Sequence, residues 1–280
     1  MNTFSSVSSL RLRSAALTIA LCGAVLLPGC TSLPDDPEER AEIKALNDPL
    51  EPMNRSIFSF NRALDTILLR PLAEAYDAVL PVTGQDMVKH FLDNLKSPVI
   101  LANDLMQGEP DRAGETLTRF AANTSIGILG LFDVSEIEYH NEDFGQTMAT
   151  WGVGEGPYLV LPFLGPSNIR DGVGIVADYH IDPFTWYTNN TGQEYLRWVR
   201  LGVRAVDTRA RNIKTLDEIE RSAIDLYATY RSFYRQYRKK EILNGREGPS
   251  VPMPQISMDM DDEDFDDDEA EDKTSLLKTD

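Results

Sequence analysis

Residues 48–70 read Asp-Pro-Leu-Glu-Pro-Met-Asn-Arg-Ser-Ile-Phe-Ser-Phe-Asn-Arg-Ala-Leu-Asp-Thr-Ile-Leu-Leu-Arg, and this stretch decides the fold class. Its apolar residues recur at intervals of three and four: Leu50, Met53, Ile57, Phe60, Leu64 and Ile67. Such spacing places them on one face of an α-helix. Asp48 is a suitable N-cap, and Pro49 suits a first helical turn. The sequence therefore predicts an amphipathic helix that begins at Asp48 and ends near Arg70-Pro71.

The same helical period continues along much of the chain. Further helices are expected after a capping box at Thr83 and Asp86, over 99–107 after a restart at Pro98, from Pro110 onward, over 144–151, and at roughly 191–213 and 216–243. Near the end of the last helix, Arg235, Arg238, Lys239 and Lys240 suit the negative end of the helix dipole. The alternation of apolar and polar residues that marks strands is nearly absent, so the predicted class is all-α.

The middle of the chain, residues 152–183, breaks this pattern. It contains ten glycines and prolines: Gly152, Gly154, Gly156, Pro157, Pro162, Gly165, Pro166, Gly172, Gly174 and Pro183. That density interrupts helices and strands alike. We expect irregular backbone with short helical pieces here, inside a single helical domain that spans residues 48–245.

The N-terminus has the features of a lipoprotein signal. Arg11 and Arg13 precede an apolar run, residues 14–27, that is short for a membrane span. The run ends in Leu27-Pro28-Gly29-Cys30, a lipobox, which predicts a signal peptide over 1–29 and lipidation of Cys30. Thr31 in place of Asp favours the outer membrane. The alternatives are a secretory signal with an incidental cysteine, or a stop-transfer anchor.

Charge and cysteine content limit the possible partners. Residues 30–47 are expected to form a tether, and residues 246–280 a disordered acidic tail. The formal charge is −18, and 11 acidic residues between Asp259 and Asp272 account for most of it. An acidic chain without a basic stripe argues against nucleic acid as a partner. The tail is either a solvated solubility segment or a device that steers a basic partner toward the domain. Cys22 leaves with the signal peptide, so no disulfide is expected.

The sequence offers no recognisable catalytic or metal site. His90, His140 and His180 lack a second ligand at metal-like spacing. Ser167 lacks the glycine that a nucleophile elbow needs after the serine, and the glycines around Glu155 lack the Lys-Ser/Thr pair of a phosphate loop. We therefore expect no enzyme activity, no cofactor and no metal.

A series of short motifs carries a resemblance to a known family. The pieces are Asp48-Pro49-Leu50-Glu51, Met53-Asn54-Arg55, Phe60-Asn61, Arg70-Pro71, Asn94-Leu95, Gln107-Gly108, Arg119-Phe120, Gly130-Leu131-Phe132-Asp133, Glu142-Asp143-Phe144-Gly145-Gln146-Thr147, Gly152–Tyr158, Gly165-Pro166-Ser167 and Arg170-Asp171. In this order the chain resembles the MlaA family, also called VacJ, of outer-membrane phospholipid-transport lipoproteins. The long acidic tail departs from the family pattern.

The resemblance implies a fold and a function that periodicity alone does not reveal. It implies an all-helical ring embedded in the inner leaflet of the outer membrane, with a polar passage for phospholipid headgroups. It further implies work with a trimeric porin and a periplasmic lipid carrier protein, and a lipid anchor on the periplasmic side. Gly154, Glu155, Gly156 and Tyr158 are the candidate residues of the lipid passage. Two alternatives are a membrane-tethered cell-envelope hydrolase and a purely structural, porin-associated lipoprotein, which needs no lumen.

Overall fold

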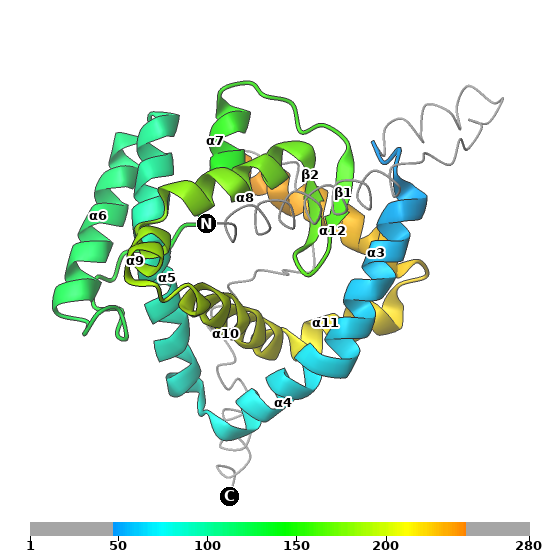
Figure 1. The fold of residues 1–280 in the computed structure, drawn as a ribbon, viewed down its shortest axis with the longest axis horizontal. Helices are drawn as coiled ribbons and strands as arrows, with labels where there is room; N and C mark the ends of the chain where they lie inside the picture. The colour runs from blue at the N-terminus through cyan, green and yellow to red at the C-terminus, as the bar shows by residue number, and fades with distance from the viewer. Residues whose placement is uncertain (1–46, 245–280) are drawn as a thin grey trace, which may run out of the picture.

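Helices form a ring around an open centre in the computed structural model, which describes residues 47–244 (Figure 1). The elements are α3 (Glu51–Leu64), the π-helical segment η1 (Asp65–Leu69), α4 (Arg70–Val79), α5 (Val82–Gln107), α6 (Pro110–Ser125), α7 (Phe144–Thr150), β1 (Tyr158–Leu161), β2 (Gly165–Asn168), α8 (Ile169–Ile181), α9 (Pro183–Thr191), α10 (Tyr195–Arg211), α11 (Ile213–Ser222) and α12 (Leu226–Ile242). The predicted all-α class is confirmed. The predicted signal peptide, Cys30, nearly all of the tether and the acidic tail lie outside the described residues.

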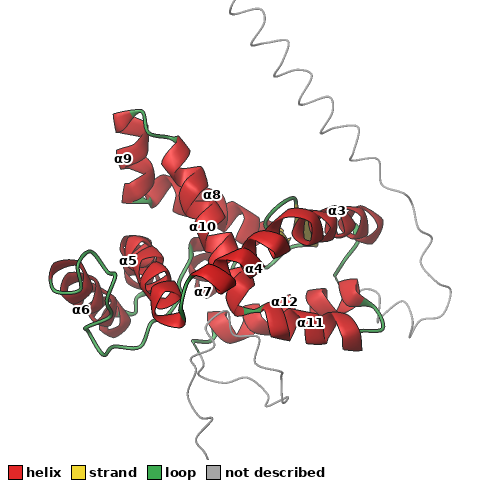
Figure 2. Cartoon of the chain, turned by 90° about the horizontal axis from the view of Figure 1, so that it is seen from below, coloured by secondary structure: helices red, strands yellow, loops and turns green. Residues whose placement is uncertain are grey.

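Seen from its edge, the ring has elements on more than one level (Figure 2). Helices α8 and α9 project from one face, whereas α11 and α12 lie toward the opposite face. Helix α10 packs against α4 and α5, and α12 packs against α7 and β2. No described helix combines the length and the apolar character that a membrane crossing requires.

The first helix does not end near Arg70-Pro71, as the sequence predicted. It passes through η1 directly into α4, which carries Pro71 in its first turn. The Arg70 N–H donates to the Asp65 carbonyl, five residues back, as in a π-helix. A proline lacks the N–H of the usual bond and crowds the preceding turn. The wider π turn just before Pro71 accommodates it without breaking the helix.

The predicted restart at Pro98 is also wrong, because α5 is continuous from Val82 to Gln107. It begins after Pro81 rather than at a Thr83 capping box, and it ends where Gly108 adopts a left-handed conformation with φ 77°. Ser97 and Val99, on either side of Pro98, are buried. Contacts of α5 with α6, α7 and α10 thus stabilise a helix that a proline would otherwise interrupt.

The last predicted helix, 216–243, is two helices. The chain turns at Ala223, and Asp225 caps α12 by accepting a hydrogen bond from the Ala228 N–H at 3.2 Å. The same carboxylate accepts from Arg55 on α3 at 2.6 Å. At this break, Asp225 both caps α12 and pairs with the distant Arg55. Helical periodicity does not encode such a long-range contact.

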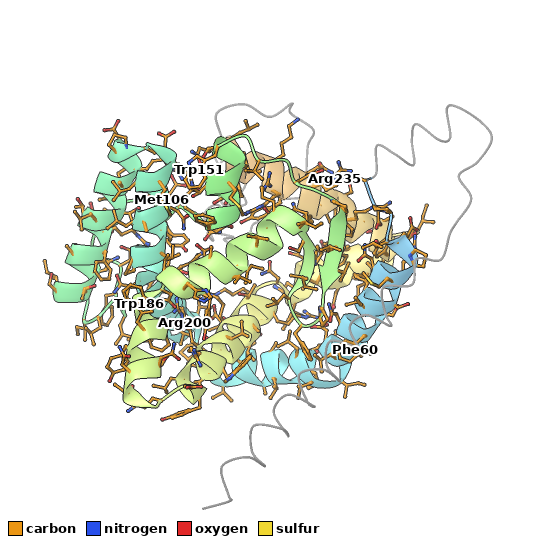
Figure 3. The ribbon with its side chains drawn as sticks, turned by 45° about the horizontal axis from the view of Figure 1, so that its top comes forward. Phe60, Met106, Trp151, Trp186, Arg200 and Arg235 are labelled. Carbon is orange, nitrogen blue, oxygen red and sulfur yellow. The ribbon has the colours of Figure 1, made fainter. Side chains whose placement is uncertain are left out.

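The interior of the described chain is mostly polar. Among residues 47–244, ten apolar and 25 polar or charged residues are buried, whereas 31 large apolar side chains are exposed. A water-soluble domain shows the reverse distribution in its interior, and large exposed apolar areas mark surfaces that contact lipid or a partner. Among the exposed aromatic residues, Figure 3 labels Phe60 on α3, Trp186 on α9 and Trp151 just after α7. Some of the apolar residues that periodicity detected, such as Phe60 and Ile67, are thus exposed, whereas others, such as Leu92 and Ile219, are buried.

Ion pairs between distant segments hold the ring closed. Arg231 on α12 donates to the buried carboxylate of Asp48 at 2.6 Å, and the Tyr227 hydroxyl bonds to the same carboxylate. Arg209 on α10 pairs with Asp65 of η1 at 2.9 Å. Because these pairs join the beginning of the described chain to its last helices, they fix the circumference of the ring.

Candidate functional site

A cavity of about 450 Å³, here called the central cavity, lies among β2, α8, α11 and α12. Its volume falls within the range of pockets that hold small organic ligands, about 300–1,000 Å³. One part of its wall is apolar and aromatic: Leu164, Ile175, Leu216, Ile219, Tyr230 and Phe233. Another part is charged: Lys96, Asp143, Asp171, Asp178 and Arg238. The cavity therefore offers both apolar and charged side chains to an amphipathic molecule.

Arg238 organises the charged part of the wall. Its guanidinium binds Asp143 through two hydrogen bonds of 2.6 Å and Asp171 through one of 2.7 Å. Burial alone would raise the pKa of Asp143, but the hydrogen bonds and charge of Arg238 outweigh burial and lower it. This cluster joins α12 to the cap of α7 and to the first turn of α8, so it shapes the cavity while contributing its charged surface.

Asp178 on α8 is a second carboxylate in the wall. It accepts hydrogen bonds from Asn103 at 3.0 Å and from the Phe144 N–H at 3.2 Å. Burial nevertheless raises the pKa of Asp178 to about 6, because these two bonds and Lys96 offset the loss of hydration only in part. Because this pKa is close to neutral, small changes around Asp178 alter the charge of its carboxyl group.

The Gly/Pro-rich middle forms a β-hairpin rather than wholly irregular backbone. Strands β1 and β2 pair antiparallel, with Leu161 opposite Gly165, and the 13-residue helix α8 follows at once. Phe163 and Gly165 take positive φ angles of 67° and 83° in the turn. The expectation of short helical pieces was thus incomplete. Four-residue strands next to glycines and prolines are too short to show a two-residue period.

Two asparagines of α3 take the place of a neighbouring strand. Asn54 donates to the Tyr158 carbonyl at 3.0 Å and accepts from the Val160 N–H at 2.9 Å. Asn61 repeats this with the Leu161 carbonyl and the Phe163 N–H, each at 2.9 Å. Seven helical residues rise about 10 Å, and so do three strand residues. The two repeats therefore match, and the amides satisfy the edge of β1 without a third strand.

The turn of the hairpin is apolar and exposed, and in Figure 1 the hairpin lies on the inner side of α3. Phe163 stacks edge-on against Phe60 with ring centroids 5.6 Å apart, and Leu164 lines the central cavity. The side-chain amides of α3 thus hold an apolar turn beside the cavity.

Three of the sequence-predicted passage residues lie just before this hairpin, the fourth, Tyr158, begins β1, and none of them lines the central cavity. Gly154 is exposed. Gly156 takes a φ of 68°, and a Cβ there would lie 3.1 Å from the Cβ of Ile169. Glu155 lies 3.4 Å from both Asn47 and Arg235. Tyr158 is buried at 3% exposure, and its ring packs against Tyr227 and Tyr234.

Sequence reasoning missed the charged residues of the wall. Lys96 had no assigned role, and Arg238 was interpreted only as a cation near a helix end. One signal was available: Asp143 and Asp171 belong to the motifs that carry the family resemblance, and both bind Arg238.

A Thr-His-Asp cluster lies in the wall of the ring but has no catalytic geometry. Thr116 and Asp104 both contact the same imidazole nitrogen of His140, at 3.1 and 3.2 Å, and Thr116 itself donates to Asp104 at 2.7 Å. A catalytic base needs its nucleophile and its orienting acid on different ring nitrogens. The adjoining cavity, of about 10 Å³, leaves no room for a substrate.

Comparisons with known proteins agree with one another. The family model of the MlaA lipoprotein matches residues 46–241. The "Intermembrane phospholipid transport system lipoprotein MlaA" of Escherichia coli (strain K12) is 33% identical over 262 residues, which cover 90% of this chain and 97% of the relative. An uncharacterized protein of Rickettsia bellii (strain RML369-C) is 36% identical over 199 residues, which cover 70% of this chain and 76% of the relative.

A solved structure described as "Structural basis for maintenance of bacterial outer membrane lipid asymmetry" is similar in fold, with a TM-score of 0.63 and 31% sequence identity. The similarity covers 70% of this chain and 98% of the solved one. Because the family model and a relative above 30% identity each span most of the chain, this protein belongs to the MlaA lipoprotein family.

Proposed function

We propose that this protein is an outer-membrane lipoprotein of a phospholipid transport system, and that it passes phospholipid from the outer leaflet through its ring toward a periplasmic carrier. This activity would maintain the lipid asymmetry of the membrane. The observation that carries this proposal is the central cavity, whose wall combines apolar and charged side chains, inside a ring that exposes many large apolar side chains. The names of the E. coli relative and of the similar solved structure support this assignment.

The exposed apolar faces suit a ring embedded in one leaflet. Interfacial helices bury an apolar face at the boundary between headgroups and acyl chains, and aromatic residues anchor at this level. Trp186 and Tyr187 on α9 and Trp198 on α10 are all more than half exposed. Lipidation at Cys30 would add about 0.8 kcal/mol for each buried CH₂ group. We therefore place the protein in the inner leaflet, anchored on the periplasmic side.

Gly154, Glu155, Gly156 and Tyr158 serve the passage in this proposal. Gly156 supplies the left-handed turn that directs the chain into β1. Tyr158 supports the hairpin from the core, beside Tyr227 and Tyr234. Glu155 is partly exposed and offers a carboxylate to a headgroup.

A trimeric porin and a periplasmic lipid carrier are the proposed protein partners, and the acidic tail is a candidate to attract the carrier. No covalent chemistry is part of the proposed function. The geometry of the His140 cluster counts against a hydrolase, and a cavity of about 450 Å³ counts against a purely structural lipoprotein.

A deletion strain tests this function. Loss of the gene should raise the amount of phospholipid in the outer leaflet, and the full-length chain should restore the original level. The Cys30→Ala chain should accumulate as unprocessed precursor and incorporate no palmitate. If the deletion leaves the outer leaflet unchanged while the protein is normally abundant in the wild type, the proposed function is wrong. Normal acylation of the Cys30→Ala chain would refute the anchor alone.

A further inference from the structure

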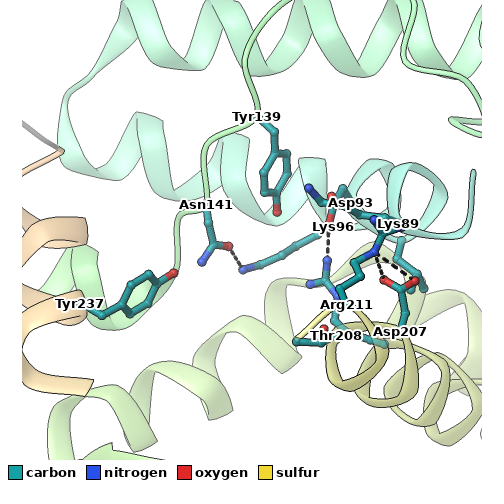
Figure 4. A pocket seen from close by; sticks show the side chains of 11 residues that line it. Lys89, Asp93, Lys96, Tyr139, Asn141, Asp207, Thr208, Arg211 and Tyr237 are labelled. Carbon is teal, nitrogen blue, oxygen red and sulfur yellow. Dashed lines mark hydrogen bonds and ion pairs between the residues drawn. The ribbon is translucent and has the colours of Figure 1, made fainter. Parts of the chain in front are cut away.

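A second cavity, of about 120 Å³ and here called the basic cavity, lies between α5 and α10 (Figure 4). Four cations line it: Lys89, Lys96, Arg204 and Arg211. Two carboxylates, of Asp93 and Asp207, face them. Arg204 pairs with Asp93, and Arg211 pairs with Asp207 at 3.2 Å and with Asp86, outside the lining, at 2.9 Å. Among the lining residues and Asp86, four cations therefore face three carboxylates, an excess of one cation; Asp143 and Asp178 lie in the wall of the central cavity, which Lys96 also lines.

Lys96 supplies a positive charge that is balanced by no carboxylate in direct contact. Within the described chain its ammonium group bonds to the side-chain oxygen of Asn141, a neutral acceptor (Figure 4). Burial and the nearby Arg204 lower the pKa of Lys96, and they outweigh the carboxylates of Asp143, Asp178 and Asp93, which act in the opposite direction. An anion beside Lys96 would reverse this effect.

Arg211 contributes a donor that lacks an acceptor. Its second terminal nitrogen is buried and has no hydrogen-bond partner within the part of the chain that the structure describes. A buried donor without an acceptor is costly, and guanidinium groups bind phosphate oxygens well. This observation is independent of the charge count, and it also points to an oxyanion.

The size and position of the basic cavity limit what it can hold. Its volume is about four times the roughly 30 Å³ that a water molecule occupies in the liquid. It is therefore suited to a headgroup but not to acyl chains. Lys96 and Tyr237 line both this cavity and the central cavity, so the two adjoin. One lipid could place its phosphate in the basic cavity and its acyl chains in the central cavity.

We propose that the basic cavity is a phosphate subsite that selects phospholipids with a net anionic headgroup, such as phosphatidylglycerol, over zwitterionic phosphatidylethanolamine. The proposal rests on the proposed function and deepens it. The negative charge of phosphatidylglycerol neutralises the single excess cation. In phosphatidylethanolamine the ammonium group cancels the charge of the phosphate, so the excess cation of the cavity remains. Lys96 and Arg211 are the specificity-determining residues.

The test uses the full-length lipoprotein, purified in detergent and equilibrated with vesicles of equal phosphatidylglycerol and phosphatidylethanolamine. Mass spectrometry of the recovered protein then measures the bound ratio of the two lipids. The wild type should favour phosphatidylglycerol about tenfold, the effect of one charged hydrogen bond. Lys96→Gln should abolish the preference, and Lys96→Arg should retain it. Lys214→Gln, the same charge change at an exposed position on α11, should behave as the wild type.

Each contrary outcome has a distinct meaning. If lipid binds with no preference, or if Lys96→Gln keeps the preference, the subsite is refuted while phospholipid transport stands. If no phospholipid binds, the proposed function fails as well. A further arm adds inorganic phosphate at constant ionic strength. Displacement of phosphatidylglycerol by phosphate supports a shared site, whereas phosphate binding that leaves the lipid in place would assign the cavity to free phosphate.

Discussion

Replacing Arg238 with methionine removes the cation that joins α12 to α7 and α8. The wild-type guanidinium makes three hydrogen bonds of 2.6–2.7 Å to the carboxylates of Asp143 and Asp171. Methionine is similar in length and apolar, so it fills the space but leaves both carboxylates without their main partner. Removing one partner of a buried ion pair costs about 3–5 kcal/mol. We expect Arg238→Met to lower the free energy of unfolding by this amount at pH 7.

The loss should depend on pH with a definite sign. In the wild type Arg238 lowers the pKa of Asp143, so this interaction stabilises the fold above the ordinary carboxyl pKa and is lost as the pH falls through the folded value. In the variant, burial without the cation raises the pKa of Asp143, and protonation relieves the unpaired charge. The difference between the two proteins should therefore be largest near neutral pH and should shrink as the pH falls through the ordinary carboxyl pKa of about 4.

Urea unfolding of the detergent-solubilised protein, followed by far-ultraviolet circular dichroism, measures both effects. Arg235→Met is the matched control on the same helix. Arg235 is one-third exposed and lies 3.4 Å from Glu155, so its loss should cost less than about 1 kcal/mol. Equal costs for the two variants, or a cost of Arg238→Met that grows as the pH falls, would refute the reasoning.

Three further substitutions test other parts of the account. Asn61→Leu should speed hydrogen exchange at the Phe163 N–H, because the bond that protects it, of about 1 kcal/mol, is lost; unchanged protection would contradict the role of α3 in holding the hairpin. Gly130→Ala should destabilise the fold by about 3 kcal/mol in thermal unfolding, since a Cβ there lies 2.3 Å from the Cβ of Asn94 at a φ of 91°; a wild-type midpoint would disprove this packing. Trp198→Glu should weaken vesicle binding of the unacylated chain about tenfold while unfolding stays unchanged, and equal binding would remove Trp198 from the membrane face.

The sequence predicted helices well where residues within the helix or next to it determine its position. Gly108 ends α5 in a left-handed conformation after the predicted last residue, Gln107, and α7 lies within the predicted 144–151. The predicted breaks at Pro71 and Pro98 failed, because a π turn and burial against other helices offset the local cost of each proline. Helix boundaries that depend on tertiary contacts are not encoded in a window of one helix.

The candidate site was harder to predict for a physical reason. An apolar helical face can contact lipid, a cavity or a core, and the period is the same in each case. Trp198 is exposed, whereas Ile219 is buried beside the central cavity. The motifs around Asp143 and Asp171 indicated the right region, but the side chain that joins them, Arg238, lies 95 residues after Asp143. Only the fold brings these charges together.

The central claim is that phospholipid passes through the cavity inside the ring, and a pair of substitutions on α8 tests it most directly. Ile175 and the next residue, Val176, are both partly exposed to solvent, but only Ile175 lines the central cavity. Ile175→Trp should obstruct the cavity, and Val176→Trp should add an aromatic ring outside it. The measurement is the amount of phospholipid in the outer leaflet of a deletion strain that carries each variant at wild-type abundance. We predict that Val176→Trp restores the wild-type level and Ile175→Trp does not. Full restoration by Ile175→Trp would contradict passage through the cavity.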